Sequence, residues 1–359
     1  MAFNYIPISD LQPGSKVVVV YLLANFQIRP KKDGSSYVTM VLRDATGKIT
    51  GVMWDNFTSV TSGAIKENDY VEVGGEINLY NGQPQMRVHR IVSVDDASVD
   101  TSFFLPKSPR CAKDMDAELA SLIGQVEDPD YRRLLDCVFG NEDFMHRFRM
   151  APSAVSMHQA YLGGLIDHTL CVTKNALKMA DNYPAANRDL LITGALLHDM
   201  GKVLEFSYDR KIAYSDAGRL LGHISIGNSM IEVHCYTLQN FPVKKKILLQ
   251  HMILSHHGLL EYGSPRCPAT LEALILHHAD LLDAQLSNYL EYTQHAAKTG
   301  TRWEYSNMFE RHMFGAPEIV DEGNAVFQYG CSLQAHLRNI QLRLQEELLE
   351  PAGELTVGE

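Results

Sequence analysis

The chain has 359 residues, of which 45% are hydrophobic and 21% are charged, and this composition predicts a globular protein with room for two or three domains. Its net charge of −11 argues against a protein that coats nucleic acid nonspecifically, and no apolar run approaches the ~18 residues that span a membrane. The N-terminus does not resemble a secretory signal and the six cysteines form no C-x-x-C pair, so we expect a cytoplasmic protein with reduced thiols.

The first 95 residues predict a small β-barrel. Short segments rich in β-branched residues lie between 15 and 94, separated by the turn sequences KKDGS, ATGK and YNGQP. Five strands in about eighty residues favour the five-stranded OB-fold, although a β-sandwich or an SH3-like barrel would fit the same strand pattern. We therefore assign residues 1–95 to an OB-fold nucleic-acid-binding domain.

Basic and aromatic residues of this barrel are candidates for binding single-stranded RNA or DNA. OB-folds commonly stack bases on aromatic side chains beside a basic groove, and the stretch FQIRPKKDGSSY (26–37) predicts a basic loop whose tip contacts phosphate. Nine Lys and Arg against eight Asp and Glu leave residues 1–94 with a charge of only +1, which indicates modest affinity. For each candidate the alternative is a core aromatic residue or an ordinary solvated cation. The candidates are Phe26, Arg29, Lys31, Lys32, Tyr37, Trp54 and Arg87.

A change in periodicity marks the second part of the chain. Residues 96–112 show no sustained period and contain two prolines, so we assign them to a linker. Apolar residues then recur every three to four positions, which predicts a helical bundle over 113–300. We expect 301–350 to hold an irregular segment and an amphipathic helix that packs on the bundle or supports oligomerisation, followed by a polar tail over 351–359.

Histidines are concentrated in the predicted bundle, where 11 of the 15 lie between residues 146 and 278. A lone helix histidine is more often a core or surface residue than a ligand, so the argument depends on an ordered set with spacings of 30, 25, 33 and 24 residues. A helical bundle can bring such side chains to one point, and imidazole with carboxylate suits first-row divalent metals. The set comprises His168, His198 with the adjacent Asp199, His223, His256 and Asp280.

His168, the His198-Asp199 pair and Asp280 resemble the signature of the HD-domain metal-dependent phosphohydrolases, and His223 with His256 resembles the subset that binds two metals. The local sequences HQAYLGGLIDHT, HDMGK and HHADLLDA are more similar still to the YhaM family of 3′–5′ exoribonucleases. Members of that family join an N-terminal OB-fold to an HD domain. The resemblance therefore implies a multidomain β + α chain, with an OB-fold barrel followed by an all-α HD-domain bundle.

The same resemblance implies two bound divalent ions, with Mn²⁺ expected and Co²⁺, Fe²⁺, Ni²⁺ or Zn²⁺ as alternatives. Asp199 would bridge to the second ion, which His223 and His256 would also hold. A water between the ions would lose a proton near neutral pH and attack phosphorus. The first ion would have four ligands: His168, His198, Asp199 and Asp280.

Lys202 and His257 are the further candidates for a catalytic role beside Asp199. Lys202 follows Asp199 by three residues and shares its helix face, so its ammonium could bind the scissile phosphate or stabilise the transition state. The alternative is a local ion pair with Glu205 or Asp199. His257 could be an extra ligand, a proton donor to the leaving oxygen or a group behind the ligands, and Asp283 is expected to orient a ligand.

The resemblance implies a hydrolase that shortens RNA from its 3′ end, with single-stranded DNA as a further substrate, and releases nucleoside monophosphates while the OB-fold guides the strand. One alternative is an HD phosphodiesterase acting on a nucleotide or cyclic nucleotide. Another is a nucleic-acid-binding regulatory protein with a vestigial HD domain, which the full ligand set disfavours. The sequence leaves open a homo-oligomer that encloses the site, and a role of Trp303, Tyr305 and Arg311 in a substrate channel or a packing loop.

Overall fold

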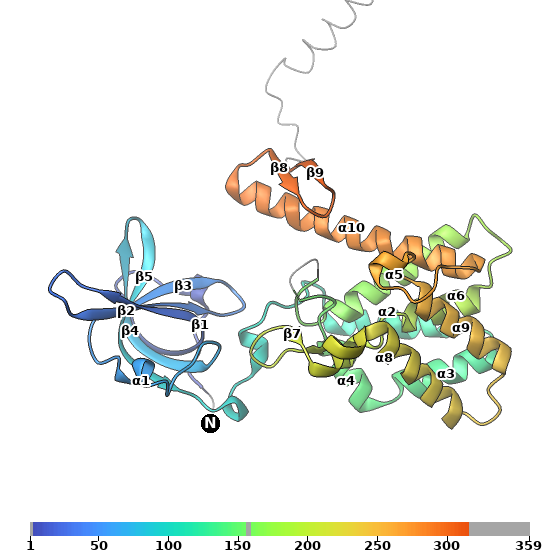
Figure 1. Ribbon diagram of the computed structural model, residues 1–359, viewed down its shortest axis with the longest axis horizontal. Helices are drawn as coiled ribbons and strands as arrows, with labels where there is room; N and C mark the ends of the chain where they lie inside the picture. The colour runs from blue at the N-terminus through green and yellow to red at the C-terminus, as the bar shows by residue number, and fades with distance from the viewer. Residues whose placement is uncertain (1–2, 156–158, 316–359) are drawn as a thin grey trace, which may run out of the picture. The chain divides into compact units, whose positions relative to one another are not determined.

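The computed structural model describes residues 3–155 and 159–315 (Figure 1). The chain divides after Tyr289 into two compact units, and the second is described as far as residue 315. The amphipathic helix and polar tail expected near the C-terminus lie outside the described residues. Within the described ranges, no helix combines the length and the apolar character needed to cross a membrane.

The N-terminal strands close into a five-stranded barrel with the order β1-β2-β3-β5-β4. The β3–β5 pair is parallel and the other neighbouring pairs are antiparallel. Alternation along β2 buries Val38, Met40 and Leu42 inside the barrel, as the period of two predicts. Closure excludes the open sandwich and confirms the predicted OB-fold barrel. The strands are β1 (Lys16–Pro30), β2 (Ser36–Arg43), β3 (Lys48–Met53), β4 (Tyr70–Tyr80) and β5 (Gln83–Ser93).

Short helical turns lie around the barrel, and the predicted linker over 96–112 packs against the rest of the protein. Phe104 is buried in the barrel core, with its ring centroid 4.9 Å from that of Tyr70. Lys107 forms a β-bridge with Leu162, just ahead of the first long helix of the site. The short elements are η1 (Ile8–Asp10), α1 (Thr58–Thr61), η2 (Asp96–Ser98) and η3 (Thr101–Phe103).

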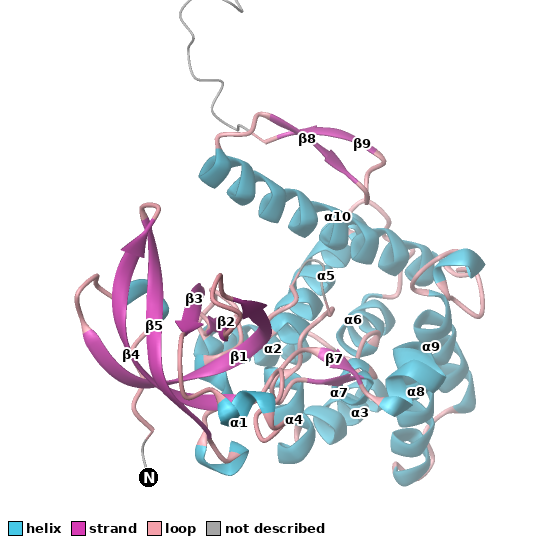
Figure 2. Cartoon of the chain, turned by 60° about the vertical axis from the view of Figure 1, so that its left-hand side comes forward, coloured by secondary structure: helices cyan, strands magenta, loops and turns pink. Residues whose placement is uncertain are grey.

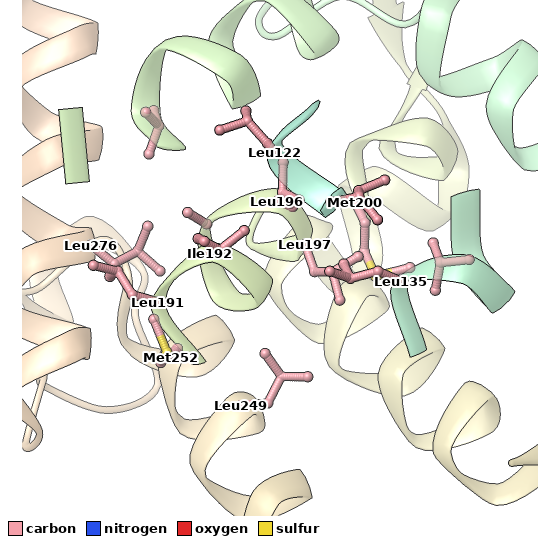
Figure 3. Close-up of a cluster of buried hydrophobic side chains, with 14 of the residues drawn as sticks. Leu122, Leu135, Leu191, Ile192, Leu196, Leu197, Met200, Leu249, Met252 and Leu276 are labelled. Atoms are coloured by element: carbon pink, nitrogen blue, oxygen red, sulfur yellow. The ribbon is translucent and has the colours of Figure 1, made fainter. Parts of the chain in front are cut away.

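A helical bundle follows, as predicted, and Figure 2 shows its helices gathered around α6. Every residue from Leu190 to Leu197 is buried, because α6 is covered by neighbouring helices (Figure 3). Leu191, for example, lies near Met252 and Leu276 in that core. The helices are α2 (Ala112–Gly124), α3 (Pro129–Phe139), α4 (Glu142–Met150), α5 (Gly164–Ala180), α6 (Arg188–Leu197), α7 (Lys202–Glu205), α8 (Asp216–Thr237), α9 (Val243–Ser255), η4 (Leu260–Tyr262) and α10 (Leu271–Thr299).

Two hairpins complete the described chain. The first, β6 (Phe206–Ser207) with β7 (Ala213–Tyr214), joins α7 to α8. The second, β8 (Trp303–Ser306) with β9 (Arg311–Phe314), forms in a segment whose sequence shows no sustained period. Its strands have four residues each, too few for an alternating pattern to stand out from chance.

Candidate metal centre

Six side chains from five parts of the helical bundle converge on one point. The apolar α6 ends at Leu197, and the turn after it places two of them, His198 and Asp199, in the interior. The burial of such groups requires hydrogen bonds, ion pairs or a metal ion. The other four come from α5 (His168), α8 (His223), the end of α9 (His256) and α10 (Asp280).

Asp199 lies between two groups of imidazoles and turns one carboxylate oxygen toward each. Its Oδ2 lies 3.3 Å from Nε2 of His168 and 3.4 Å from Nε2 of His198. Its Oδ1 lies 3.4 Å from Nε2 of His223 and 3.6 Å from Nε2 of His256. A carboxylate placed in this way can serve two metal ions at once.

The first group consists of His168, His198 and Asp280, whose ligand atoms lie within 4.8 Å of one another. Nε2 of His168 is 3.1 Å from Oδ1 of Asp280 and 3.4 Å from Nε2 of His198. Two imidazoles and a carboxylate, completed by Asp199, match the donor set that first-row divalent metals prefer.

The second group consists of His223, His256 and His257, which again lie within 4.8 Å of one another. Three buried atoms that face each other here make no hydrogen bond within the described part of the chain: Oδ1 of Asp199, Nε2 of His223 and Nε2 of His256. Each buried polar atom left unpaired costs about 1–3 kcal/mol. The donors present therefore fit a cation, because one ion would satisfy all three atoms.

Hydrogen bonds at the far side of each ring set the imidazole tautomers. Nδ1 of His198 donates to the carbonyl oxygen of Ala195 at 2.8 Å, and Nδ1 of His256 donates to that of Ile253 at 2.7 Å. A carbonyl oxygen only accepts, so the proton resides on Nδ1 and the lone pair of Nε2 faces the centre. His257 is held in the same way, with Nδ1 2.8 Å from the carbonyl oxygen of Tyr262.

Carboxylates orient the other two imidazoles. Nδ1 of His168 lies 2.7 Å from Oδ2 of Asp283, so Asp283 contacts one of the predicted ligands. Nδ1 of His223 lies 3.0 Å from Oε1 of Glu205, and the backbone N–H of His223 donates to the same oxygen. From the sequence, Glu205 was expected only as a partner of Lys202, because a contact with His223 across 18 residues leaves no local signal.

The protonation of the centre follows from the charges packed into it. Burial raises the pKa of Asp199, but the positive charge of Lys202 and the hydrogen bond with His168 outweigh this effect and hold that pKa well below its usual value. Burial lowers the pKa of His168, but hydrogen bonds to Asp199, Asp280 and Asp283 hold it well above the ordinary value. Asp199 is therefore ionised, the form in which a carboxylate can bind a metal ion.

Lys202 forms the ion pair that the sequence analysis held as the alternative to phosphate binding. Its Nζ lies 2.6 Å from Oδ2 of Asp199. The side chain also lines a cavity of about 450 Å³ together with His168, His257, His277 and Asp280. Lys202 is thus placed both to pair with the motif carboxylate and to reach a molecule in the cavity.

Three polar residues that line the cavity were not among the candidates from the sequence: Ser153, Tyr262 and His277. The hydroxyl of Ser153 is buried beside the cavity and makes no hydrogen bond to any residue that the structure describes. Asp167, next to His168 in the sequence, is buried and accepts hydrogen bonds from the side chains of Ser108, Arg110 and Tyr161. Neither position could be inferred from local patterns, because both depend on how loops fold over α5.

Some of the candidate nucleic-acid-binding residues of the barrel lie together, and the others are dispersed over it. The rings of Tyr37 and Trp54 stack with centroids 4.7 Å apart, and Nζ of Lys31 lies 5.6 Å from the Trp54 ring. Arg29 is exposed opposite Tyr37 in the β1–β2 ladder. Phe26 packs partly against the barrel core, which was the alternative for an aromatic residue. Lys32 and Arg87 are exposed, and neither forms an ion pair with the described residues.

Comparison with known proteins adds two domain matches. Residues 165–285 match the family model of the HD domain, a range that contains all six converging residues, and residues 23–94 match an OB-fold nucleic acid binding domain. The second OB-fold domain of replication protein A from Methanococcus maripaludis is 24% identical over 26% of this chain and 95% of that chain, with a TM-score of 0.21. The HD domain of the L. monocytogenes phosphodiesterase PgpH is 19% identical over 45% of this chain and 87% of that chain, with a TM-score of 0.27.

Proposed function

Since the chain joins an OB-fold nucleic acid binding domain to an HD domain, we propose that it is a metal-dependent 3′–5′ exoribonuclease. Its substrates would be single-stranded RNA and, as a further substrate, single-stranded DNA, and its products nucleoside monophosphates. The observation that carries the proposal is Asp199, whose two oxygens each face a separate set of imidazole nitrogens. This arrangement, together with a barrel for single strands, supports phosphodiester hydrolysis on a polymer.

The residues that would hold two divalent ions, with Mn²⁺ expected, are those already described. His168, His198 and Asp280 would bind on the Oδ2 side of Asp199, and His223 with His256 on the Oδ1 side. The chemistry that such ions supply is a water nucleophile at neutral pH and neutralisation of charge on the phosphate. Asp283 and Glu205 would keep the imidazoles oriented throughout the reaction.

Lys202 would bind the non-bridging oxygens of the scissile phosphate. Burial lowers its pKa, but the Asp199 carboxylate outweighs this effect and holds the pKa above the usual value, so the ammonium stays charged. With a ligand in the cavity, a phosphate oxygen could share that ammonium with Asp199. His257, whose Nε2 is the free ring nitrogen, could be a further ligand or protonate the leaving oxygen.

The adjoining cavity supports action at a chain end. Its volume of about 450 Å³ is within the range of small-molecule sites and suits one terminal nucleotide rather than a folded RNA. The unpaired hydroxyl of Ser153 would hydrogen-bond a ribose or phosphate oxygen there. On the barrel, Tyr37 and Trp54 would stack a base of the incoming strand beside Lys31.

The direct test is metal-dependent shortening of a 5′-labelled oligoribonucleotide by the full chain. After chelation, Mn²⁺ should restore a ladder of products that shorten one nucleotide at a time. His256→Ala should abolish most of this activity, whereas His146→Ala, at an exposed histidine outside the site, should leave it unchanged. Hydrolysis of mononucleotides or cyclic nucleotides without any action on oligomers would overturn the proposal in favour of a small substrate.

A second test separates the barrel from the chemistry. Trp54→Ala should weaken binding of a long single strand by about 1–3 kcal/mol, the value of one stacked base, while hydrolysis of a dinucleotide is retained. Equal loss on both substrates would show that Trp54 does not guide the strand.

A further inference from the structure

The β8–β9 hairpin carries rings at every position of one face. Directly opposed residues of an antiparallel pair share a face, and the register pairs Trp303 with Phe314 and Tyr305 with His312. The ring centroids of these pairs are 5.1 and 5.4 Å apart. The two pairs lie two residues apart on each strand, so all four rings form one continuous surface.

The opposite face of the hairpin is turned toward α10. Oε2 of Glu304, which lies on that face, is 3.5 Å from Nδ1 of His295 on the helix. Tyr292 also donates its hydroxyl to the carbonyl oxygen of Met313 at 2.6 Å. The rings of Trp303 and Tyr305 therefore lie on the face away from this contact, whereas Phe314 is half-buried, and Figure 2 shows the hairpin lying along α10. Trp303 is 60% exposed and Tyr305 is 53% exposed.

We propose that this ring face binds single-stranded nucleic acid by base stacking, as a second contact surface besides the barrel. Stacking on aromatic rings tolerates any base, because every base has a π-face. None of the residues on the ring face is a carboxylate that would repel phosphates, since Glu304 lies on the opposite face. Arg311 pairs with Ser306 and lies on the opposite face as well, so the proposed contact depends on the rings.

The position of the tryptophans supports the same ligand. The chain has only two, Trp54 and Trp303, which are 41% and 60% exposed, so neither is a core residue. Each lies against a second ring, Trp54 on Tyr37 and Trp303 on Phe314. The hairpin thus repeats the ring pair that the barrel offers. The inference takes its ligand class from the proposed function, but it makes a claim about binding that does not depend on hydrolysis.

The two tryptophans allow each surface to be observed separately in the full chain. Trp54→Phe leaves Trp303 as the single fluorescent tryptophan, and Trp303→Phe leaves Trp54. An oligouridylate of about 12 nucleotides is titrated into each variant with EDTA present, so that no metal-dependent cleavage occurs. We expect saturable quenching of Trp303 emission. Tyr305→Ala should weaken this binding about tenfold, whereas Tyr183→Ala, at an equally exposed tyrosine (53%), should not change it.

Each possible result of this titration either supports or overturns the proposed stacking surface. Unchanged Trp303 emission, in a variant whose thermal unfolding matches the wild type, would overturn it even if the chain degrades RNA. Trp303 emission that responds to protein concentration and not to RNA would also overturn it, since the face would then be covered by a second copy. Saturable quenching in a chain without nuclease activity would retain the stacking surface and refute the proposed function instead.

Discussion

Gly201 lies in the HDMGK turn and tests whether the metal centre depends on close approach of two backbone segments. A Cβ at Gly201 would lie 2.1 Å from the carbonyl oxygen of His223 and 2.7 Å from the backbone nitrogen of Gly227. The glycine itself has φ −64°, a value that alanine adopts without strain. Any effect of Gly201→Ala must therefore come from contact with α8.

The size of the effect follows from that contact. Real Cβ atoms keep at least 3.0 Å from other heavy atoms, so the two segments must separate by about 0.9 Å. The obstacle is backbone, which cannot rotate away as a flexible side chain would. Overpacking of this kind costs about 1–3 kcal/mol of unfolding free energy. It should also move the imidazole of His223 away from Oδ1 of Asp199, which is now 3.4 Å from its Nε2.

We expect Gly201→Ala to retain the metal site formed by His168, His198 and Asp280 and to weaken the one that includes His223. Isothermal titration with Mn²⁺ should show one site close to wild type and one with at least tenfold lower affinity. Gly124→Ala is the matched control, because a Cβ there meets nothing within 4 Å. A folded Gly201→Ala protein that binds both ions as tightly as the wild type would refute the reasoning.

Further outcomes follow from the contacts around the centre and from one distant ion pair. Asp283→Asn should weaken metal binding about 10–100-fold in competition with a chelating dye, and unchanged affinity would show that it does not orient His168. EDTA should lower the midpoint of thermal unfolding and Mn²⁺ should restore it, because three buried atoms otherwise have no partner; a midpoint indifferent to metal would argue against the site. Burial raises the pKa of Asp128, but the hydrogen bond from Lys245 outweighs this effect and lowers the pKa overall. The ionised Asp128 therefore stabilises the folded protein above the unfolded pKa of about 3.9, and this stabilisation is lost as the pH falls through the folded pKa. In urea unfolding, Lys245→Met should thus lower the free energy of unfolding more near pH 7 than near pH 3. An equal decrease at the two pH values would contradict the stabilising role of this ion pair.

Local patterns in the sequence predicted a β-barrel followed by a helical bundle, and they identified the residues that could form the metal centre. Strand alternation and turn residues depend on neighbours within a few positions, so the barrel could be predicted before its closure was seen. The spacing of His168, His198 and Asp280 likewise placed each on a predicted helix. That these side chains share one point was an expectation from resemblance, because spacing along the chain does not determine how helices pack.

Only the tertiary structure decided how the polar groups are supported. Glu205 and Asp283 reach histidines 18 and 115 residues away, and no local pattern encodes such contacts. Packing also placed Phe26 partly against the barrel core while Trp54 stacked on Tyr37, although the sequence treated both aromatics alike. Side-chain chemistry is a local property, but burial and partners are set by the whole fold, and these decide which groups can bind a ligand.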